Sequence, residues 1–262
     1  MKIRVAIAGA GGRMGSEVVR ALQNEKDLSL TGAVDPAFKG QDAGKISGID
    51  SLGILVEKEI GGILGNCDVL VDFTHPNQVY SNALLAIEAG VRPVIGTTGL
   101  TGSQIEELER RCSEKKIGGI LAPNFALGAI LMMRFAQMAA RHFGSAEIIE
   151  LHHDQKADAP SGTAIKTAEL MLAERERFGL GNAHETEKIP GARGGSLDGI
   201  RLHSIRLPGL VAHQEVIFGG KGQTLTIRHD SLSRESFMPG VVLAVREVMG
   251  LDRFVYGLEN FI

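Results

Sequence analysis

The chain contains few of the residues on which disulfide scaffolds, base-stacking surfaces and membrane spans depend. Its 262 residues include no tryptophan, two tyrosines and two cysteines, Cys67 and Cys112. Two cysteines in a chain of this length predict reduced thiols rather than a disulfide framework. With a formal net charge of −3 and no long basic run, we expect no nucleic-acid partner. No segment reaches the roughly 18 apolar residues that cross a bilayer, so we expect no membrane partner either.

We expect no secretory signal at the start of the chain. The apolar run over residues 3–8 is too short for a secretory signal and leads straight into a glycine-rich turn, so we expect a cytoplasmic protein. Glycine itself is abundant, with 34 residues and no regular period. Such a distribution excludes collagen-like repeats and indicates turns and close approaches of the backbone.

The first half of the chain alternates short apolar runs with helical patterns. Strands are expected at residues 3–8, 28–34, 69–73, 93–95 and 119–122, and helices at 14–23, 76–90 and 101–116. This alternation predicts an α/β fold built on a Rossmann-type, doubly wound parallel sheet.

The pattern changes after residue 126. We expect helices at 127–143 and 163–178, a loop at 179–199 and a final helix at 233–249. Strands are expected at 146–152, 200–207, 211–218 and 223–229, with a hairpin turn at 218–222. Adjacent strands of this kind predict a second, α+β domain with a mixed sheet.

The glycine-rich turn Gly9-Ala10-Gly11-Gly12-Arg13-Met14-Gly15 follows a strand and opens a helix, which is the context of a dinucleotide-binding fingerprint. Glycine allows the backbone to approach a diphosphate, and the helix N-terminus offers it free N–H groups. The glycines depart from the common G-x-G-x-x-G spacing, because Met14 stands where the third would be. The better register is Gly9, Gly12 and Gly15.

Asp35 ends the second strand and can accept hydrogen bonds from the adenosine ribose, which favours NADH. Arg13 and Lys39 are close enough in sequence to offset a 2′-phosphate, so NADPH stays open. Ligands of open α/β sheets bind outside the carboxyl ends of the strands, where this chain has polar residues at 72–74, 96–99 and 122–125. Each segment alone is a weak signal: 96–99 also fits a turn into a capped helix, and Asp35 also fits an ordinary solvated loop carboxylate.

The densest chemistry lies between Glu150 and Thr163. Adjacent residues on a strand point to opposite faces, so His152 and His153 suit one metal poorly, and one core and one surface histidine is a plain alternative. An imidazole can transfer protons near neutral pH, and Lys156 adds a cation unless it is an ordinary loop lysine.

Ser161-Gly162-Thr163 opens a helix whose first N–H groups suit a carboxylate. Together with the histidine and the lysine, this segment predicts a small carboxylate substrate. Ser161 lacks the G-x-S-x-G setting of a hydrolase nucleophile.

Five segments in order, 9–15, 72–74, 96–99, 124–125 and 150–164, resemble the 4-hydroxy-tetrahydrodipicolinate reductase (dihydrodipicolinate reductase) family. The resemblance covers nearly the whole chain, and the run from His152 to Ala164 is its specific part. It implies NAD(P)H-dependent reduction of a cyclic dicarboxylate, with net loss of water, in the diaminopimelate route of lysine biosynthesis. It also implies a homotetramer joined through the substrate-domain sheets.

The resemblance further implies roles for individual residues. His152 matches the catalytic proton donor or acceptor, and Lys156 matches the second proton donor and a partner of the substrate carboxylate. His153, Gly162 and Thr163 match substrate-binding positions. The matching cofactor positions are Gly9, Ala10, Gly11, Gly12, Arg13, Met14, Asp35, Gly96, Thr97, Thr98, Ala122, Pro123, Asn124 and Phe125.

The same resemblance implies a dinucleotide-binding domain of residues 1–125 plus 233–262, with a substrate-binding and oligomerisation domain of 126–232 inserted in it. Arg234 is a further candidate for the substrate carboxylate. The chain departs from the family at Gln155, where some members have histidine, and at Pro36, where an arginine often follows the acidic residue. Loss of that arginine removes a partner for the 2′-phosphate, so we predict a preference for NADH.

Three other functions remain open on the sequence alone. Another Rossmann oxidoreductase acting on a small carboxylate shares the first half but does not explain the order of residues from His152 to Thr163. An NAD-binding sensor without activity needs the glycine turn but no proton donor. A metal-dependent hydrolase would use His152, His153 and Asp154.

Overall fold

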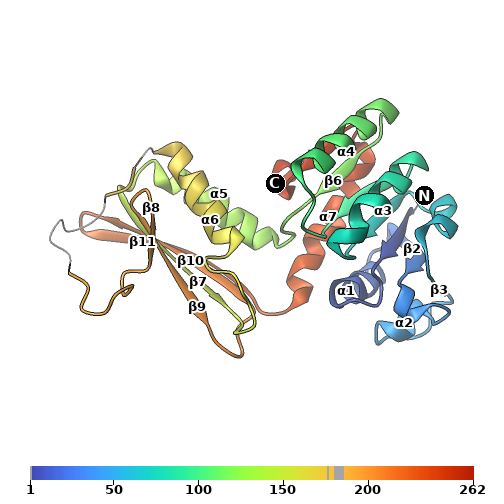
Figure 1. Ribbon diagram of the computed structural model, residues 1–262, viewed down its shortest axis with the longest axis horizontal. Helices are drawn as coiled ribbons and strands as arrows, with labels where there is room; N and C mark the ends of the chain where they lie inside the picture. The colour runs from blue at the N-terminus through green and yellow to red at the C-terminus, as the bar shows by residue number, and fades with distance from the viewer. Residues whose placement is uncertain (1, 176, 180–185) are drawn as a thin grey trace. The chain divides into compact units, whose positions relative to one another are not determined.

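The computed structural model describes residues 2–175, 177–179 and 186–262. Its contacts divide the chain into two compact units, Met1–Ala126 with Phe237–Ile262, and Leu127–Ser236. Figure 1 shows the first unit in blue, green and red and the second in yellow-green to orange, so the second is inserted between two parts of the first. The functional division at 125 and 233 remains a prediction.

The first unit is built on a parallel sheet in the order β12-β6-β5-β4-β1-β2-β3. The strands are β1 Ile3–Ala8, β2 Leu28–Val34, β3 Val56–Glu57, β4 Val69–Asp72, β5 Arg92–Ile95, β6 Gly119–Leu121 and β12 Phe254–Tyr256. Its longer helices are α1 Arg13–Leu22, α3 Pro76–Glu88, α4 Gly102–Lys115 and α7 Met238–Glu247, and α2 Ala43–Ile46 is one short turn. Because α1 packs with α7 and α3 with α4, the sheet is doubly wound, as the sequence predicts.

Central strands of this sheet are buried on both faces. Every residue of β4 is buried, and four consecutive residues of β1, Val5 to Ala8, are fully inaccessible. Such continuous apolar runs are typical of parallel strands covered by helices on both sides. Because these strands run parallel, the carboxyl ends of β1, β2, β4, β5 and β6 lie at the same edge of the sheet.

Two strands of the first unit were not expected from the sequence. β3 has two residues and β12 has three, too short for either to show a period. Each is recognisable only by its pairing, β3 with β2 and β12 with β6. The single helix expected at 233–249 is also wrong in detail, because a 3-10 turn at Arg234–Phe237 precedes α7.

The second unit has a mixed sheet in the order β11-β10-β7-β9-β8, in which only β7 and β9 run parallel. Its strands are β7 Ser145–His152, β8 Gly195–Leu197, β9 Ile200–Arg206, β10 Ala212–Gly220 and β11 Gln223–Ser231. The helices α5 Leu127–Ala140 and α6 Gly162–Glu174 cover one face of the sheet (Figure 1). They bury Ile148, Val216 and Phe218 there.

Both helices of the second unit are shorter than the sequence predicts. α5 ends at Ala140 rather than at 143. α6 ends at Glu174 rather than at 178, because the backbone of the next residue, Arg175, is extended. The loop expected at 179–199 contains the short strand β8, and its residues 180–185 lie outside the described residues.

Cys67 and Cys112 are free and buried, as expected for reduced thiols. Among the residues that the structure describes, no helix is both long and apolar enough to cross a membrane.

Candidate active site

The glycine-rich turn after β1 is packed so closely that side chains are excluded at several positions. Gly9 has a φ of +80°, and a Cβ there would lie 2.5 Å from the Phe73 carbonyl oxygen. A Cβ on Gly15 would collide with the Gly9 carbonyl, and one on Gly11 with the Phe38 ring. The turn and the first turn of α1 thus fold onto each other at Gly9 and Gly15, the two ends of the register expected from the sequence.

The N-terminus of α1 has no side chain to satisfy its first N–H groups. Its N-cap is Gly12, in an extended conformation and without a side-chain acceptor. Since the first N–H groups of a helix have no partner within it, those of Arg13, Met14 and Gly15 are suited to an anion. A diphosphate fits this site, because the helix supplies free N–H donors and Gly12 places no side chain over them.

Asp35 is fixed at the end of β2 by two backbone amides. One carboxylate oxygen accepts the N–H of Gly11 and the other accepts that of Ala37, each at 3.0 Å. The first of these bonds joins the carboxylate to the glycine-rich turn. Asp35 therefore presents an oriented negative charge beside the diphosphate position, where an adenosine ribose would lie.

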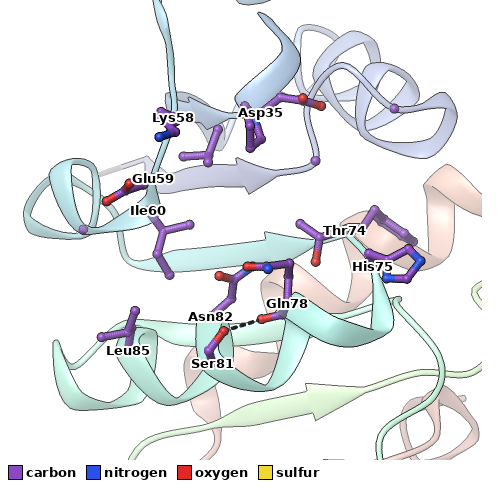
Figure 2. A pocket seen from close by; sticks show the side chains of 16 residues that line it. Asp35, Lys58, Glu59, Ile60, Thr74, His75, Gln78, Ser81, Asn82 and Leu85 are labelled. Atoms are coloured by element: carbon purple, nitrogen blue, oxygen red, sulfur yellow. Dashed lines mark hydrogen bonds between the residues drawn. The ribbon is translucent and has the colours of Figure 1, made fainter. Parts of the chain in front are cut away.

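A cavity of about 690 Å³ extends from Gly9, Gly12 and Asp35 along the same edge of the sheet. Figure 2 shows Gln78 and Asn82 projecting from α3 toward it, with Asp35 and Lys58 on its other side. Neither Lys58 nor these α3 residues was predicted from the sequence to be part of a site. The spacing of Gln78, Ser81, Asn82 and Leu85 was an available signal, because it places them on one face of a helix.

A buried carboxylate, Asp72, ties together the strand ends beside this cavity. It is 1% exposed and accepts hydrogen bonds from the Thr74 N–H at 2.9 Å and the Thr97 hydroxyl at 3.0 Å. The amide of Asn82 donates to its other oxygen at 2.8 Å. The loops after β4 and β5 are therefore held to α3 by one side chain.

The remaining predicted cofactor residues lie at the same sheet edge but do not line the cavity. Gly96 packs on the Phe73 ring, and Thr97 is buried with its hydroxyl on Asp72, whereas Thr98 is exposed. Ala122 and Phe125 are buried, the latter against Phe73. Next to them, Pro123 is exposed and Asn124 caps the N–H of Ala126.

In the second unit, three elements converge on the carboxylate of Glu150, which is fully buried on β7. His152 Nδ1 lies 2.5 Å from its Oε2 atom. Arg206, at the end of β9, donates to both oxygens at 2.8 Å. The N–H of Ser161, which precedes α6, donates to Oε1 at 3.2 Å. His152 and the start of α6 are therefore held close together.

The charges in this cluster shift the pKa values of its members. Burial disfavours the ionised form of Glu150, but hydrogen bonds from Arg206, Ser204 and His152 outweigh it and lower the pKa of the carboxyl. Burial also lowers the pKa of His152, although the Glu150 carboxylate opposes this shift. Glu150 is therefore ionised near neutral pH, and His152 titrates below its ordinary range.

The other predicted substrate residues lie in the turn after β7 and at the start of α6. The Lys156 ammonium bonds both carboxylate oxygens of Asp158, at 2.7 and 2.9 Å. Ser161 is the N-cap of α6, and its hydroxyl accepts the Ala164 N–H at 3.2 Å. Gly162 and Thr163 are the first residues of the helix, so their N–H groups lack partners within it.

His153 is exposed in the turn after β7, and its carbonyl accepts the Lys156 N–H at 3.2 Å. Over the described residues, no cluster of three or more histidine, cysteine or acidic side chains has a metal-binding arrangement.

Sequence reasoning gave no role to Glu150 or Arg206. The signal for Glu150 was its place on β7, because Ile148, Glu150 and His152 share one face of the strand and Ile148 is in the core. A charged residue on a buried face requires partners. Arg206 is more than fifty residues away, so only the pairing of β7 with β9 identifies it as the partner.

Comparison with protein-family models matches residues 3–125 to the N-terminal model of dihydrodipicolinate reductase and residues 128–262 to the C-terminal model. The chain is 54% identical to the 4-hydroxy-tetrahydrodipicolinate reductase of Desulfitobacterium hafniense, over 100% of this chain and 99% of that protein. It is 52% identical to the enzyme of the same name from Moorella thermoacetica, over 99% and 98% of the two chains.

Among solved structures, a dihydrodipicolinate reductase from a Paenisporosarcina species, with dipicolinate bound, superposes with a TM-score of 0.89. The two chains are 45% identical, and each is covered in full. An amine dehydrogenase from Mycobacterium smegmatis has a TM-score of 0.70 at 15% identity, covering 99% of this chain and 96% of its own. At that identity the likeness concerns the fold alone.

Proposed function

The chain belongs to the dihydrodipicolinate reductase family of NAD(P)-dependent oxidoreductases, and we propose that it reduces 4-hydroxy-tetrahydrodipicolinate to tetrahydrodipicolinate in the diaminopimelate route to lysine. The observation that carries this proposal is the convergence of His152, Arg206 and the start of α6 on Glu150. A proton-transferring group thereby lies beside an anion-binding helix end. A related structure with bound dipicolinate, a planar cyclic dicarboxylate, supports the substrate class.

In the proposed reaction, the first N–H groups of α6, at Gly162 and Thr163, bind one substrate carboxylate. Lys156 exchanges its bond with the exposed Asp158 for a bond to substrate. His152 and Lys156 are the two groups that we propose as donors of the one proton that the ring gains. His153 adds a contact to the substrate. The ring loses water and gains a hydride and a proton in the overall reaction.

The cofactor is held in this proposal by the first unit. The turn from Gly9 to Gly15 and the N-terminus of α1 bind the diphosphate, and Asp35 binds the adenosine ribose. When bound, the reduced nicotinamide supplies the hydride. Thr97, Thr98 and the segment 122–125 are proposed to contact the cofactor farther along the sheet edge.

A coupled assay tests the proposed reaction. Pyruvate, aspartate semialdehyde and the synthase that condenses them generate the substrate in place, and oxidation of NADH or NADPH is followed by absorbance at 340 nm. We expect absorbance to fall only when both the synthase and this protein are present. The absence of a fall with either cofactor would contradict the proposal.

We predict that kcat/KM is higher with NADH than with NADPH, because Asp35 repels a 2′-phosphate and no arginine follows it. In Asp35→Asn the repulsion is removed, and the NADPH to NADH ratio of kcat/KM should rise about tenfold. Asp50→Asn, an equal change of charge at an exposed position outside the cavity, should leave the ratio unchanged. A wild-type preference for NADPH would contradict the assignment of Asp35.

We also propose a homotetramer joined through the second unit, as the family implies. The face of its sheet opposite α5 and α6 carries half-buried apolar side chains, among them Ile149, Leu151 and Ile217, interspersed with charged ones. Sedimentation equilibrium should report four times the chain mass of 27.9 kDa. The mass of a single chain at micromolar concentration would exclude this assembly.

A further inference from the structure

Glu150 is placed to do more than neutralise a neighbouring charge. Its two oxygens receive four hydrogen bonds from β7, β9 and the segment before α6. Oε2 is shared by His152 and Arg206, and Oε1 by Ser161 and Arg206. A carboxylate with no exposed surface and donors on both oxygens is held in one orientation.

We propose that Glu150 is a positioning residue, which holds the His152 ring with its Nδ1–H on the carboxylate and so leaves Nε2 as the nitrogen that transfers the proton. An ionised carboxylate can only accept hydrogen bonds, so the ring nitrogen that faces it must donate. In neutral His152 the lone pair then lies on Nε2, and in the imidazolium Nε2 carries the second proton. The lowered pKa of Glu150 agrees with the ionised form. The proposal rests on proton transfer by His152.

Arg206 makes this arrangement stable in a buried site and extends it to the substrate-binding turn. Besides Glu150, its guanidinium donates to the Asp158 carbonyl at 2.7 Å and to the Ile205 carbonyl at 2.8 Å. The Asp158 side chain in turn bonds Lys156. One buried ion pair therefore sets the positions of His152, the turn that carries Lys156 and the first residues of α6.

The charge of Glu150 affects the protonation of His152, an effect that a purely structural role would not require. The charged groups that face His152 are Glu150 on its own strand, Lys156 in the turn and Arg206 on β9. Of these, only Glu150 favours the imidazolium, while Lys156 and Arg206 disfavour it. Removing the carboxylate charge must therefore lower the pKa of His152 and, with it, the pH at which the protonated form is lost.

The test is Glu150→Gln, which offers one acceptor oxygen where the carboxylate offers two. We expect kcat to fall about 100-fold, with KM for NADH within about twofold of wild type. We expect the basic limb of the pH profile of kcat to move about one unit toward lower pH. In ¹⁵N-histidine NMR spectra, the His152 signals, assigned by their loss in His152→Gln, should show the Nδ1–H tautomer in wild type and lose it in the variant.

Glu147→Gln is the matched control. Glu147 lies on the same strand but on the opposite face, and it too pairs with a histidine, His203 at 2.8 Å, and with Arg193. This variant should keep the wild-type kcat, basic limb and His152 spectrum. An unchanged basic limb together with an unchanged Nδ1–H tautomer in Glu150→Gln would overturn the proposal.

Glu150→Asp keeps the charge but shortens the side chain, and it decides the question if Glu150→Gln does not fold. We expect a kcat between those of wild type and Glu150→Gln, a basic limb near that of wild type, and faster exchange of the Nδ1 proton. A wild-type kcat and exchange rate in Glu150→Asp would contradict the positioning role. Because the tautomer is measured without substrate, this result is independent of the substrate assignment.

Discussion

Replacing His152 by glutamine is expected to lower kcat by about 100- to 10,000-fold while leaving the affinity for NADH unchanged. Glutamine retains polar atoms near the position of the imidazole but has no group that titrates near neutral pH. The elements that we propose to bind the dinucleotide, the glycine-rich turn and Asp35, belong to the other unit. Loss of turnover without loss of cofactor binding is therefore the signature of a proton-transfer residue.

The measurement pairs steady-state kinetics with titration of NADH fluorescence in the absence of substrate. His142→Gln serves as a control, since His142 is exposed after α5 and takes no part in the site. A His152→Gln enzyme that retains wild-type kcat would remove His152 from the mechanism. A parallel loss of NADH affinity would mean that the substitution disturbs the protein more widely.

Gly15→Ala is expected to weaken NADH binding by about 100-fold, because its Cβ would collide with the Gly9 carbonyl, which is backbone and cannot rotate away. The glycine-rich turn would have to move off the first turn of α1, and the diphosphate would lose part of its N–H donors. The same displacement should lower the melting temperature by several degrees.

Gly102→Ala is the matched control for this change. Gly102 also occupies the first turn of a helix in the same unit, but a Cβ there would meet no atom within 4 Å. Its NADH affinity should equal that of wild type, and its stability should be the same or slightly higher. Wild-type NADH binding by Gly15→Ala would contradict the placement of the diphosphate at this turn.

Local patterns were sufficient to predict most of the first unit. The bounds of β1 and β2 agree with the prediction residue for residue, because apolar runs between turn residues mark buried strands. The start of α4 also has a local signal, because Thr101 and Gln104 have the spacing of a capping box and form one in the structure. By contrast, β3 and β12 have no local signal, since each is defined only by pairing with a distant strand.

The same distinction applies to the site. Motifs that are contiguous in sequence, such as the segment from His152 to Thr163, could be identified as candidate site residues from the sequence, and their roles stay predictions. Asp72, Glu150 and Arg206 could not, because their roles depend on partners contributed by other strands and helices. A charged residue on a predicted buried strand indicates that a partner is needed, but it does not show which residue that partner is.

Transfer of hydride from the cofactor to the ring is the central claim, and it can be measured with NADH deuterated at both C4 positions. The substrate is generated by the synthase reaction, and the product is analysed by mass spectrometry after a single turnover. We predict a product one mass unit heavier than that formed with unlabelled NADH. A product without deuterium, formed while the cofactor is oxidised, would contradict the account.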